Sequence, residues 1–330
     1  MTNPSTQAES TREAFGKALI ELGEHDPRVV VLDADLAGST RTEYFAMRFP
    51  DRFIEVGIAE ANMMGIASGL AAIGKIPFAT TFCSFASKQA TNMICVSICY
   101  PKRNVKIVGA YAGLLVGGNG ATHMALEDLA IMRSLPGMVV IEPADGLETR
   151  SALAAIAQYH GPVYLRLNRN PYPDVSPSGF RFQIGKATLL RSGRNVTLIA
   201  CGVMVSQAML AAVELDQQGV EATVINCSCI KPLDSATIIE AASRTNAVVT
   251  CENHNIHGGL GSAVAEILSE HCPTPIVRVG VRDVFGECGD DISLMKKYHL
   301  TPADIAQAAR RVLKRGDLAP PIQAMAGSTP

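Results

Sequence analysis

Short apolar runs alternate with longer amphipathic stretches along most of this chain. The runs have the length of strands, are rich in Val and Ile, and mostly lack polar alternation, which is typical of parallel strands covered on both faces. The stretches between them predict helices, so we expect α/β layers joined by right-handed crossovers. Strands are predicted at residues 29–32, 76–80, 105–109, 138–142, 163–167, 196–201, 222–226, 247–251 and 276–279.

Several of the expected helices begin at recognisable signals. Residues 10–13 read Ser-x-x-Glu and residues 145–148 read Asp-x-x-Glu, which are patterns of capped helix starts. Pro302 occupies a first helical position, where its missing N–H is not needed. A further helix is expected over 63–74, with Glu60 at its start.

A stretch rich in Pro, Ser and Gly divides the chain into two domains. We place a surface linker at residues 170–187, where few periodic apolar positions occur. The first α/β domain then covers residues 1–180, including the start of the linker, and the second covers 188–316. Both are expected to be layered and to have largely parallel sheets. The Pro- and Ala-rich end, 317–330, is expected to be disordered.

Composition narrows the class of protein. The chain has 330 residues, 48% apolar and 18% charged, which is enough to bury a sizeable core. A net charge of −2 and the absence of Trp give no reason to expect a nucleic acid partner. The uncharged apolar runs are well below the ~20 residues of a membrane-spanning helix, so no membrane partner is expected. Nine unclustered Cys residues predict reduced thiols in a cytoplasmic protein.

The chemically distinctive side chains follow the predicted strands of the first domain. In open α/β sheets, ligands bind beyond the carboxyl ends of the strands. If the sheet is parallel, these side chains meet at one edge. They are Asp35 after the first strand, Phe82 and Phe85 after the second, residues 111–123 after the third, and Arg166 and Arg169 at the strand before the linker.

Glu60 is the most informative single residue. It begins a helix whose other residues are small and apolar, and no basic residue follows within two turns. A Glu in the first turn is favoured by the helix dipole, which is the ordinary explanation. If the helix is buried, however, the protonated form is favoured, and a neutral carboxylic acid can donate a hydrogen bond to a ring nitrogen.

Several motifs accompany Glu60 in a fixed order. They are Leu-Asp-Ala-Asp-Leu (32–36), Val-Gly-Ile-Ala-Glu-Ala-Asn (56–62), Thr-Thr-Phe-Cys-Ser-Phe (80–85), Gly-Gly-Asn-Gly-Ala-Thr-His (117–123), Arg-Ser-Leu-Pro-Gly (133–137) and Glu-Pro-Ala-Asp (142–145), followed by Glu-Asn-His (252–254) and Gly-Gly-Leu-Gly-Ser-Ala-Val-Ala-Glu (258–266). In this order and spacing the first six resemble the pyrimidine-binding domain of transketolases, and the two later motifs resemble their C-terminal domain. The resemblance extends over residues 10–315.

The resemblance implies roles in catalysis and cofactor binding. Glu60 would hydrogen-bond the pyrimidine ring of thiamine diphosphate, and His123 would contact the reacting carbons of the substrate. Phe82 and Phe85 would hold the aminopyrimidine ring, although two Phe residues alone would be read as core. Two further cofactor positions are implied, Asp35 and Lys88, and Lys88 stands where several transketolases have a third aromatic residue.

The substrate positions match the family only in part. Ser39 and Arg169 match contacts to the sugar phosphate, with Arg166 as a nearby alternative. Asn119 stands where the family has an Asp that reads a substrate hydroxyl, and Tyr111 stands where a His helps to hold the phosphate. An anionic sugar is therefore expected to bind, with an unusual pattern of hydroxyls.

One element of a complete transketolase is missing. The family binds the diphosphate and Mg²⁺ through Gly-Asp-Gly and a downstream Asn, and this chain has no Gly-Asp-Gly. The resemblance therefore implies the C-terminal subunit of a split transketolase, a transferase of carbohydrate metabolism that moves a two-carbon ketol unit from a ketose to an aldose. An N-terminal subunit would bind the diphosphate and hold Mg²⁺, and the assembly would be a heterotetramer.

Alternatives remain within and outside this chemistry. The β subunit of a 2-oxo acid dehydrogenase shares the architecture, but its motif usually reads Pro-Ile-Ala-Glu around the key Glu. A non-catalytic, regulatory subunit would have no need of Glu60, Phe82, Phe85 and His123 together. His254 and His257 invite a metal interpretation, but no complete ligand set surrounds them in the sequence, so no metal ligand is expected in this chain.

Overall fold

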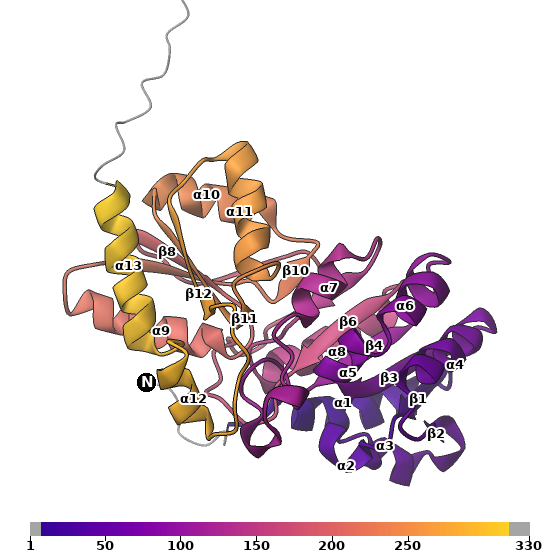
Figure 1. Ribbon diagram of the computed structural model, residues 1–330. Coiled ribbons are helices and arrows are strands. Elements are labelled where there is room, and N and C mark those ends of the chain that lie inside the picture. Colours follow the sequence, from indigo (N-terminus) through magenta and orange to yellow (C-terminus); the bar gives the residue numbers. More distant parts are fainter. Residues whose placement is uncertain (1–7, 317–330) are drawn as a thin grey trace, which may run out of the picture.

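Two α/β units lie side by side in the computed structural model, which describes residues 8–316 (Figure 1). The first sheet has seven strands in the order β10-β5-β6-β4-β3-β1-β2, and the second has five in the order β12-β11-β8-β9-β7. Within each sheet all pairs are parallel except the outermost pairs β10–β5 and β7–β9. The prediction of two largely parallel α/β sheets is therefore confirmed.

The strands closely follow the apolar runs. Those of the first sheet are β1 (Val29–Asp33), β2 (Phe53–Glu55), β3 (Ile76–Phe82), β4 (Lys106–Ala110), β5 (Val139–Ile141), β6 (Val163–Leu167) and β10 (Cys229–Lys231). Those of the second are β7 (Thr188–Arg191), β8 (Val196–Ala200), β9 (Ala222–Asn226), β11 (Val248–Asn255) and β12 (Ile276–Val281).

Helices cover both sheets. They are α1 (Thr11–His25), α2 (Ala37–Thr40), α3 (Glu43–Arg48), α4 (Glu60–Ala72), α5 (Cys83–Lys88), α6 (Thr91–Met93), α7 (Asp128–Ser134), α8 (Gly146–Gln158), α9 (Met204–Asp216), α10 (Ser235–Thr245), α11 (Leu260–His271), α12 (Asp291–Lys297) and α13 (Pro302–Gly316). Short 3₁₀ turns occur at Pro50–Arg52, Gly117–Asn119 and Ala121–His123, and a π-helix at Ile94–Cys99.

The signals at the helix starts work as predicted. The hydroxyl of Ser10 accepts a hydrogen bond from the Glu13 amide, and Asp145 accepts one from the Glu148 amide. Thr301 and Asp304 bond each other reciprocally at the start of α13. These caps satisfy amides that have no partner inside the helix.

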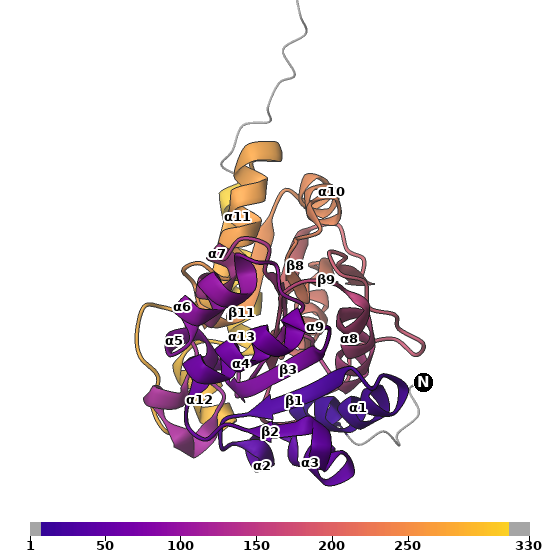
Figure 2. The same ribbon diagram turned by 90° about the vertical axis from the view of Figure 1, so that its right-hand side faces the viewer.

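Each central strand is buried on both faces. In β1, Val29 and Val31 pack with Phe15 of α1, whereas Val30 and Leu32 pack with Met63 of α4. Alternate residues of a strand point to opposite faces, so an apolar run without alternation supplies both cores. Figure 2 shows the same layering from the side, with α1 and α4 on either side of β1 and β3.

Three short strands were not predicted: β2, β7 and β10. All three are short and lie at sheet edges, and β2 and β7 are only partly buried, which weakens their apolar patterning. β10 follows β9 in the second unit but pairs with β5 of the first sheet. The predicted boundary therefore does not separate the sheets completely, because this strand ties the two units together.

The remaining expectations about organisation concern connections and ends. Residues 168–187 contain no helix or strand, as expected of a linker, although Phe182 in it is buried. The tail at 317–330 lies outside the described residues. No helix between residues 8 and 316 is both long and apolar enough to cross a membrane.

Candidate active site

The parallel strands β6, β4, β3, β1 and β2 are neighbours, so their carboxyl ends form one continuous edge. The predicted site residues follow these ends in the same order. Arg169 comes after β6, Tyr111 after β4, Phe82 ends β3, Asp35 follows β1, and Glu60 begins α4 after β2. Residues far apart in the sequence are thus assembled along one edge of the sheet.

Four rings form the centre of this edge. Phe82 and Phe85 stack with their centroids 5.7 Å apart, and Tyr111 stacks on Phe82 at 4.1 Å. His123 meets Phe85 edge-on at 5.2 Å. Phe82 is buried, whereas Phe85 and His123 are half-buried. The arrangement leaves an aromatic wall that can hold a flat ring.

Glu60 is the first residue of α4 and is only 9% exposed. No described residue donates a hydrogen bond to its carboxyl group, and the residue before it provides no side-chain cap. The other buried residues of α4 are Met63, Met64 and Ala67, so this carboxyl group stands at an apolar helix. A buried carboxyl without a protein partner is available to a ligand.

Backbone hydrogen bonds help to hold the loop that carries His123: the His123 amide donates to the Gly120 carbonyl at 3.1 Å, and the Ala125 amide donates to the Gly113 carbonyl at 3.3 Å. The His123 Nδ1 lies 3.0 Å from the Thr122 hydroxyl, and Asn119 is exposed at the end of a 3₁₀ turn. Gly117 has a positive φ of 66°, and a Cβ on it would lie 2.3 Å from Nη1 of Arg169. Only glycine permits both the backbone conformation and this close approach.

Two guanidinium groups flank Tyr111. Those of Arg12 and Arg169 lie 5.2 and 5.3 Å from the ring centroid, and Arg12 also donates to the Tyr111 hydroxyl at 3.1 Å. Arg12 further donates to the backbone carbonyls of Ser39 (2.7 Å) and Arg169 (2.8 Å). It therefore links three of the predicted substrate residues.

Neither arginine has a carboxylate partner among residues 8–316, although Arg169 donates to the Val116 carbonyl at 2.8 Å. Burial lowers the pKa of the Arg12 guanidinium from its usual value, because the charge is partly removed from water. Two guanidinium groups at the carboxyl edge, without a carboxylate partner in the described part of the chain, have the charge and the donors to bind an anion.

Arg12 was not predicted from the sequence. Its position offered a signal, because a cation in the first turn of a helix opposes the helix dipole and is favoured only by something else. A tertiary contact places Arg12 at the site. The Thr11 hydroxyl accepts a hydrogen bond from the Asn168 amide at 2.6 Å, which docks the start of α1 at the end of β6.

The loop between β1 and α2 is held by a buried carboxylate. Asp33 accepts hydrogen bonds from the hydroxyls of Thr40 (2.7 Å) and Thr42 (2.8 Å) and from the Leu36 amide (2.7 Å). Burial raises the pKa of Asp33 to about 6 in spite of these bonds. Asp35 adopts a φ of 61° and is exposed, so Asp33 fixes the loop that carries Asp35.

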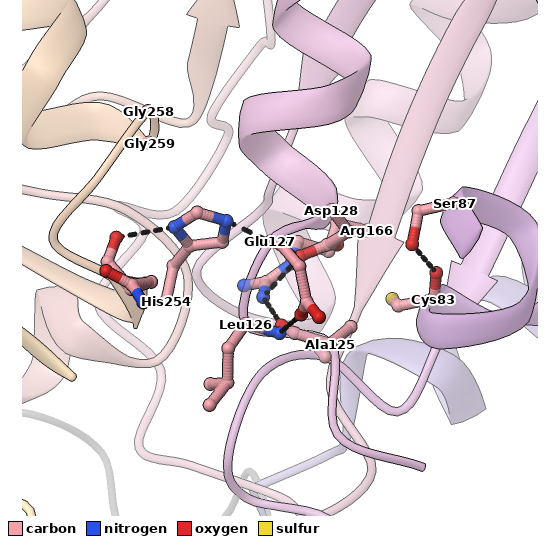
Figure 3. A network of polar contacts seen from close by, with 12 residues as sticks. Cys83, Ser87, Ala125, Leu126, Glu127, Asp128, Arg166, His254, Gly258 and Gly259 are labelled. Carbon is pink, nitrogen blue, oxygen red and sulfur yellow. Dashed lines mark hydrogen bonds and ion pairs between the residues drawn. The ribbon is translucent and has the colours of Figure 1, made fainter. Parts of the chain in front are cut away.

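Arg166 must be removed from the set of substrate residues. Its guanidinium is fully buried and pairs with Asp128 and Glu142, both at 2.7 Å. It also donates to the carbonyls of Ala125 and Asn253, and Figure 3 shows it beside Asp128 and Ala125. With its donors used inside the protein, it cannot reach a sugar, and Arg169 alone fits the predicted role.

This network joins the two units. Asn253 belongs to the second unit, as does Cys201, whose thiol donates to Glu142 at 3.2 Å. Burial alone would raise the pKa of Asp128, but the charge of Arg166 outweighs it and lowers that pKa below its usual range. The pKa of Glu142 is raised by burial, which Arg166 only partly offsets.

His254 and the neighbouring Glu252 make contacts that stabilise the fold. His254 is fully buried, and its Nδ1 lies 2.6 Å from the Asn255 carbonyl; burial lowers its pKa to about 4. Glu252 accepts from the amides of Leu260 and Gly261 and so caps α11. Among the described residues, no group of three or more His, Cys, Asp or Glu is placed to hold a metal ion.

Lys88 is directed toward Glu127, 3.1 Å away, and toward the Met124 carbonyl at 3.3 Å. It lies one turn after Phe85 in α5, at the margin of the aromatic wall. Its assignment to the cofactor, like that of Asp35, stays a prediction.

Two domains of a known protein family match this chain. The transketolase pyrimidine-binding domain matches residues 7–175, and the transketolase C-terminal domain matches residues 185–305. The chain belongs to the transketolase family, whose members are transferases. Relatives named as transketolase subunits, matched over nearly their whole length, favour this reading over a 2-oxo acid dehydrogenase β subunit.

Relatives of similar length identify the chain as the C-terminal subunit of a split transketolase. It is 46% identical over 304 residues (92% of this chain, 94% of the relative) to a 6-deoxy-6-sulfo-D-fructose transketolase subunit of Clostridium sp.. It is 36% identical over 305 residues (92% and 97%) to an apulose-4-phosphate transketolase subunit of Phocaeicola vulgatus.

Solved structures agree. A split gene transketolase, described as an inactive β4 tetramer, superposes with a TM-score of 0.87 at 50% identity, covering 92% of this chain and 98% of that one. The transketolase of Leishmania mexicana gives a TM-score of 0.79 at 26% identity, covering 97% of this chain but 48% of that one. The chain thus corresponds to about half of an undivided transketolase.

Proposed function

We propose that this chain, together with an N-terminal subunit, transfers a two-carbon ketol unit from a ketose with an anionic end to an aldose, using thiamine diphosphate. The observation that carries the proposal is the single sheet edge. It holds Glu60 at the start of α4, the aromatic wall beyond β3 and β4, and, beside Tyr111, two cations without a carboxylate partner among residues 8–316.

The residues present fit the pyrimidine half of thiamine diphosphate. Glu60 offers a buried carboxyl group with no described partner, and Phe82 and Phe85 offer stacked rings for a heteroaromatic plane. When bound, the cofactor supplies the electron sink that allows a carbon–carbon bond to break. We assign the diphosphate and Mg²⁺ to the N-terminal subunit, because this chain lacks Gly-Asp-Gly. The proposed assembly is a heterotetramer in the cytoplasm, where its nine free thiols stay reduced.

Each site residue of this chain has its own task in the proposed reaction. Glu60 holds a proton against the ring nitrogen of the cofactor and so sets its orientation. His123, packed edge-on against Phe85, faces the reacting oxygens and moves protons there as a general acid and base. Arg12 and Arg169 bind the far end of the sugar, and Ser39 and Asn119 contact its polar groups.

The anion site favours a modified donor. Tyr111 replaces the family's His, which removes one possible cation, and Asn119 replaces an Asp. Two guanidinium groups and a hydroxyl suit a singly charged sulfonate as well as a phosphate. The names of the two relatives, one for a sulfo-sugar and one for apulose 4-phosphate, support a donor outside the ordinary pentose phosphates.

We expect the reconstituted enzyme to prefer such a donor. The kcat/KM for 6-deoxy-6-sulfofructose should exceed that for xylulose 5-phosphate by about tenfold or more, because the absence of one charge-assisted hydrogen bond from the family's Asp or His costs about 1.4 kcal/mol or more. Coupled assays with sulfofructose, fructose 6-phosphate, apulose 4-phosphate and xylulose 5-phosphate measure this order. A wide preference for xylulose 5-phosphate would show that Tyr111 and Asn119 are neutral replacements.

We also expect the purified chain alone, with thiamine diphosphate and Mg²⁺, to show only background ketol transfer. The reason is the missing diphosphate site. Adding an N-terminal transketolase chain with Gly-Asp-Gly from the same genome should restore turnover, measured as aldehyde release from the same donors. Robust turnover by the single chain would contradict the split-enzyme proposal.

A further inference from the structure

The segment between β12 and α12 lies on the loop that carries His123. In Figure 1 it runs (orange) beside the loop that follows β4 (magenta), and Figure 2 shows the same neighbourhood. The Cys288 thiol donates to the Gly118 carbonyl at 3.5 Å. Gly286 packs so tightly that a Cβ on it would lie 2.1 Å from the Met124 sulfur. The second unit thus reaches the active-site loop of the first.

The far end of the segment is also fixed. Asp291 accepts hydrogen bonds from the Tyr172 hydroxyl (2.7 Å) and the Asn170 amide (2.9 Å) of the linker. In its middle, the Phe285 carbonyl accepts from the Tyr298 hydroxyl at 3.2 Å. The backbone is therefore anchored, and the side chains of the segment are held where the structure places them.

Two apolar side chains of this anchored segment face outward. Phe285 is 84% exposed and Val284 is 52% exposed. They line a hollow of about 250 Å³ whose other walls include Lys88, Glu127 and Met124. The hollow therefore borders both the aromatic wall, through Lys88, and the loop of His123. A single exposed apolar residue is ordinary, but here an exposed Phe and an exposed Val line one hollow beside the active-site loop, as in a surface that another protein covers.

We infer that Val284 and Phe285 form part of the surface on which the N-terminal subunit docks. The inference rests on the proposed function, which requires a second chain to complete the cofactor site. That chain must close over the open side of Phe85 and His123, and the hollow is the adjoining surface. The exposed ion pair of Lys88 and Glu127 supplies a polar rim around the apolar pair. The second unit thereby contributes part of the surface that binds the N-terminal subunit.

The test compares two equally exposed valines. Val284→Asp and Phe285→Asp alter the proposed surface, whereas Val213→Asp alters α9, where Val213 is also 52% exposed. Each variant is mixed with an N-terminal chain bearing Gly-Asp-Gly, and the Kd is measured by sedimentation velocity, with Tm as the control for folding. We expect Phe285→Asp to weaken the complex about 10- to 100-fold and Val284→Asp less, with Val213→Asp unchanged.

The other outcomes have distinct meanings. Unchanged affinity for Phe285→Asp, with a wild-type complex formed, would overturn the docking inference while leaving the proposed reaction intact. A change only in self-association of this chain would also overturn it, because the surface would then face a second copy. Loss of binding as inferred, in a wild-type complex without ketol transfer, would support the docking surface and contradict the proposed function.

Discussion

Replacing Glu60 with Gln is expected to lower the kcat of the reconstituted enzyme by about 10²- to 10⁴-fold, the usual contribution of a positioned acid or base. Gln matches Glu in size but cannot present a carboxyl proton to a ring nitrogen. The side chain is only 9% exposed, and no described residue bonds its carboxyl group, so the change removes no contact inside this chain. Steady-state turnover with the best donor measures the effect.

The matched control is Glu240→Gln, an exposed position on α10 in the second unit. Both variants should melt within a few degrees of the wild type, since neither removes a buried contact in this chain. If Glu60→Gln retains turnover within about threefold, or ~0.7 kcal/mol in activation free energy, Glu60 is not catalytic. A non-catalytic subunit would then be the better description.

Replacing Arg166 with Met is expected to lower the free energy of unfolding by about 3–5 kcal/mol, the usual cost of removing one partner from a buried ion pair. Asp128 and Glu142 would be left buried and facing each other's charge, without the guanidinium that both now bind. The carbonyls of Ala125 and Asn253 would lose a donor as well. Urea unfolding followed by circular dichroism and by fluorescence measures the loss.

Arg169→Met is the control, because it removes the same type of side chain three residues later. Arg169 is half-buried, has no described carboxylate partner and donates to one carbonyl, so a loss of about 1 kcal/mol is expected. In catalysis the order should be reversed: Arg169→Met should raise the KM for the anionic donor more than Arg166→Met does. Equal stability losses would refute the division between a structural and a substrate-binding arginine.

The sequence predicted the elements that pattern alone can specify. Fully apolar runs such as 29–32 are typical of central parallel strands buried on both faces, so the two sheets followed from local composition. The parallel arrangement then placed the residues after β1, β3, β4 and β6 at one edge, because parallel strands end on the same side. Edge strands such as β10 escaped prediction, since a short strand buried by a distant partner carries little pattern of its own.

The roles of the arginines could not be predicted from the sequence. Arg166 and Arg169 lie three residues apart near the linker, and the sequence does not show which of them pairs with carboxylates. The fold decides: Arg166 lies within β6 and faces Asp128 and Glu142, whereas Arg169 lies beyond the strand and faces Tyr111. Arg12 joins the site because α1 docks beside β6. The sequence by itself determined the class of fold and the edge of the sheet that holds the site. Charge pairing depends on distances across the fold, so only the tertiary structure decided which cations stay free for a substrate.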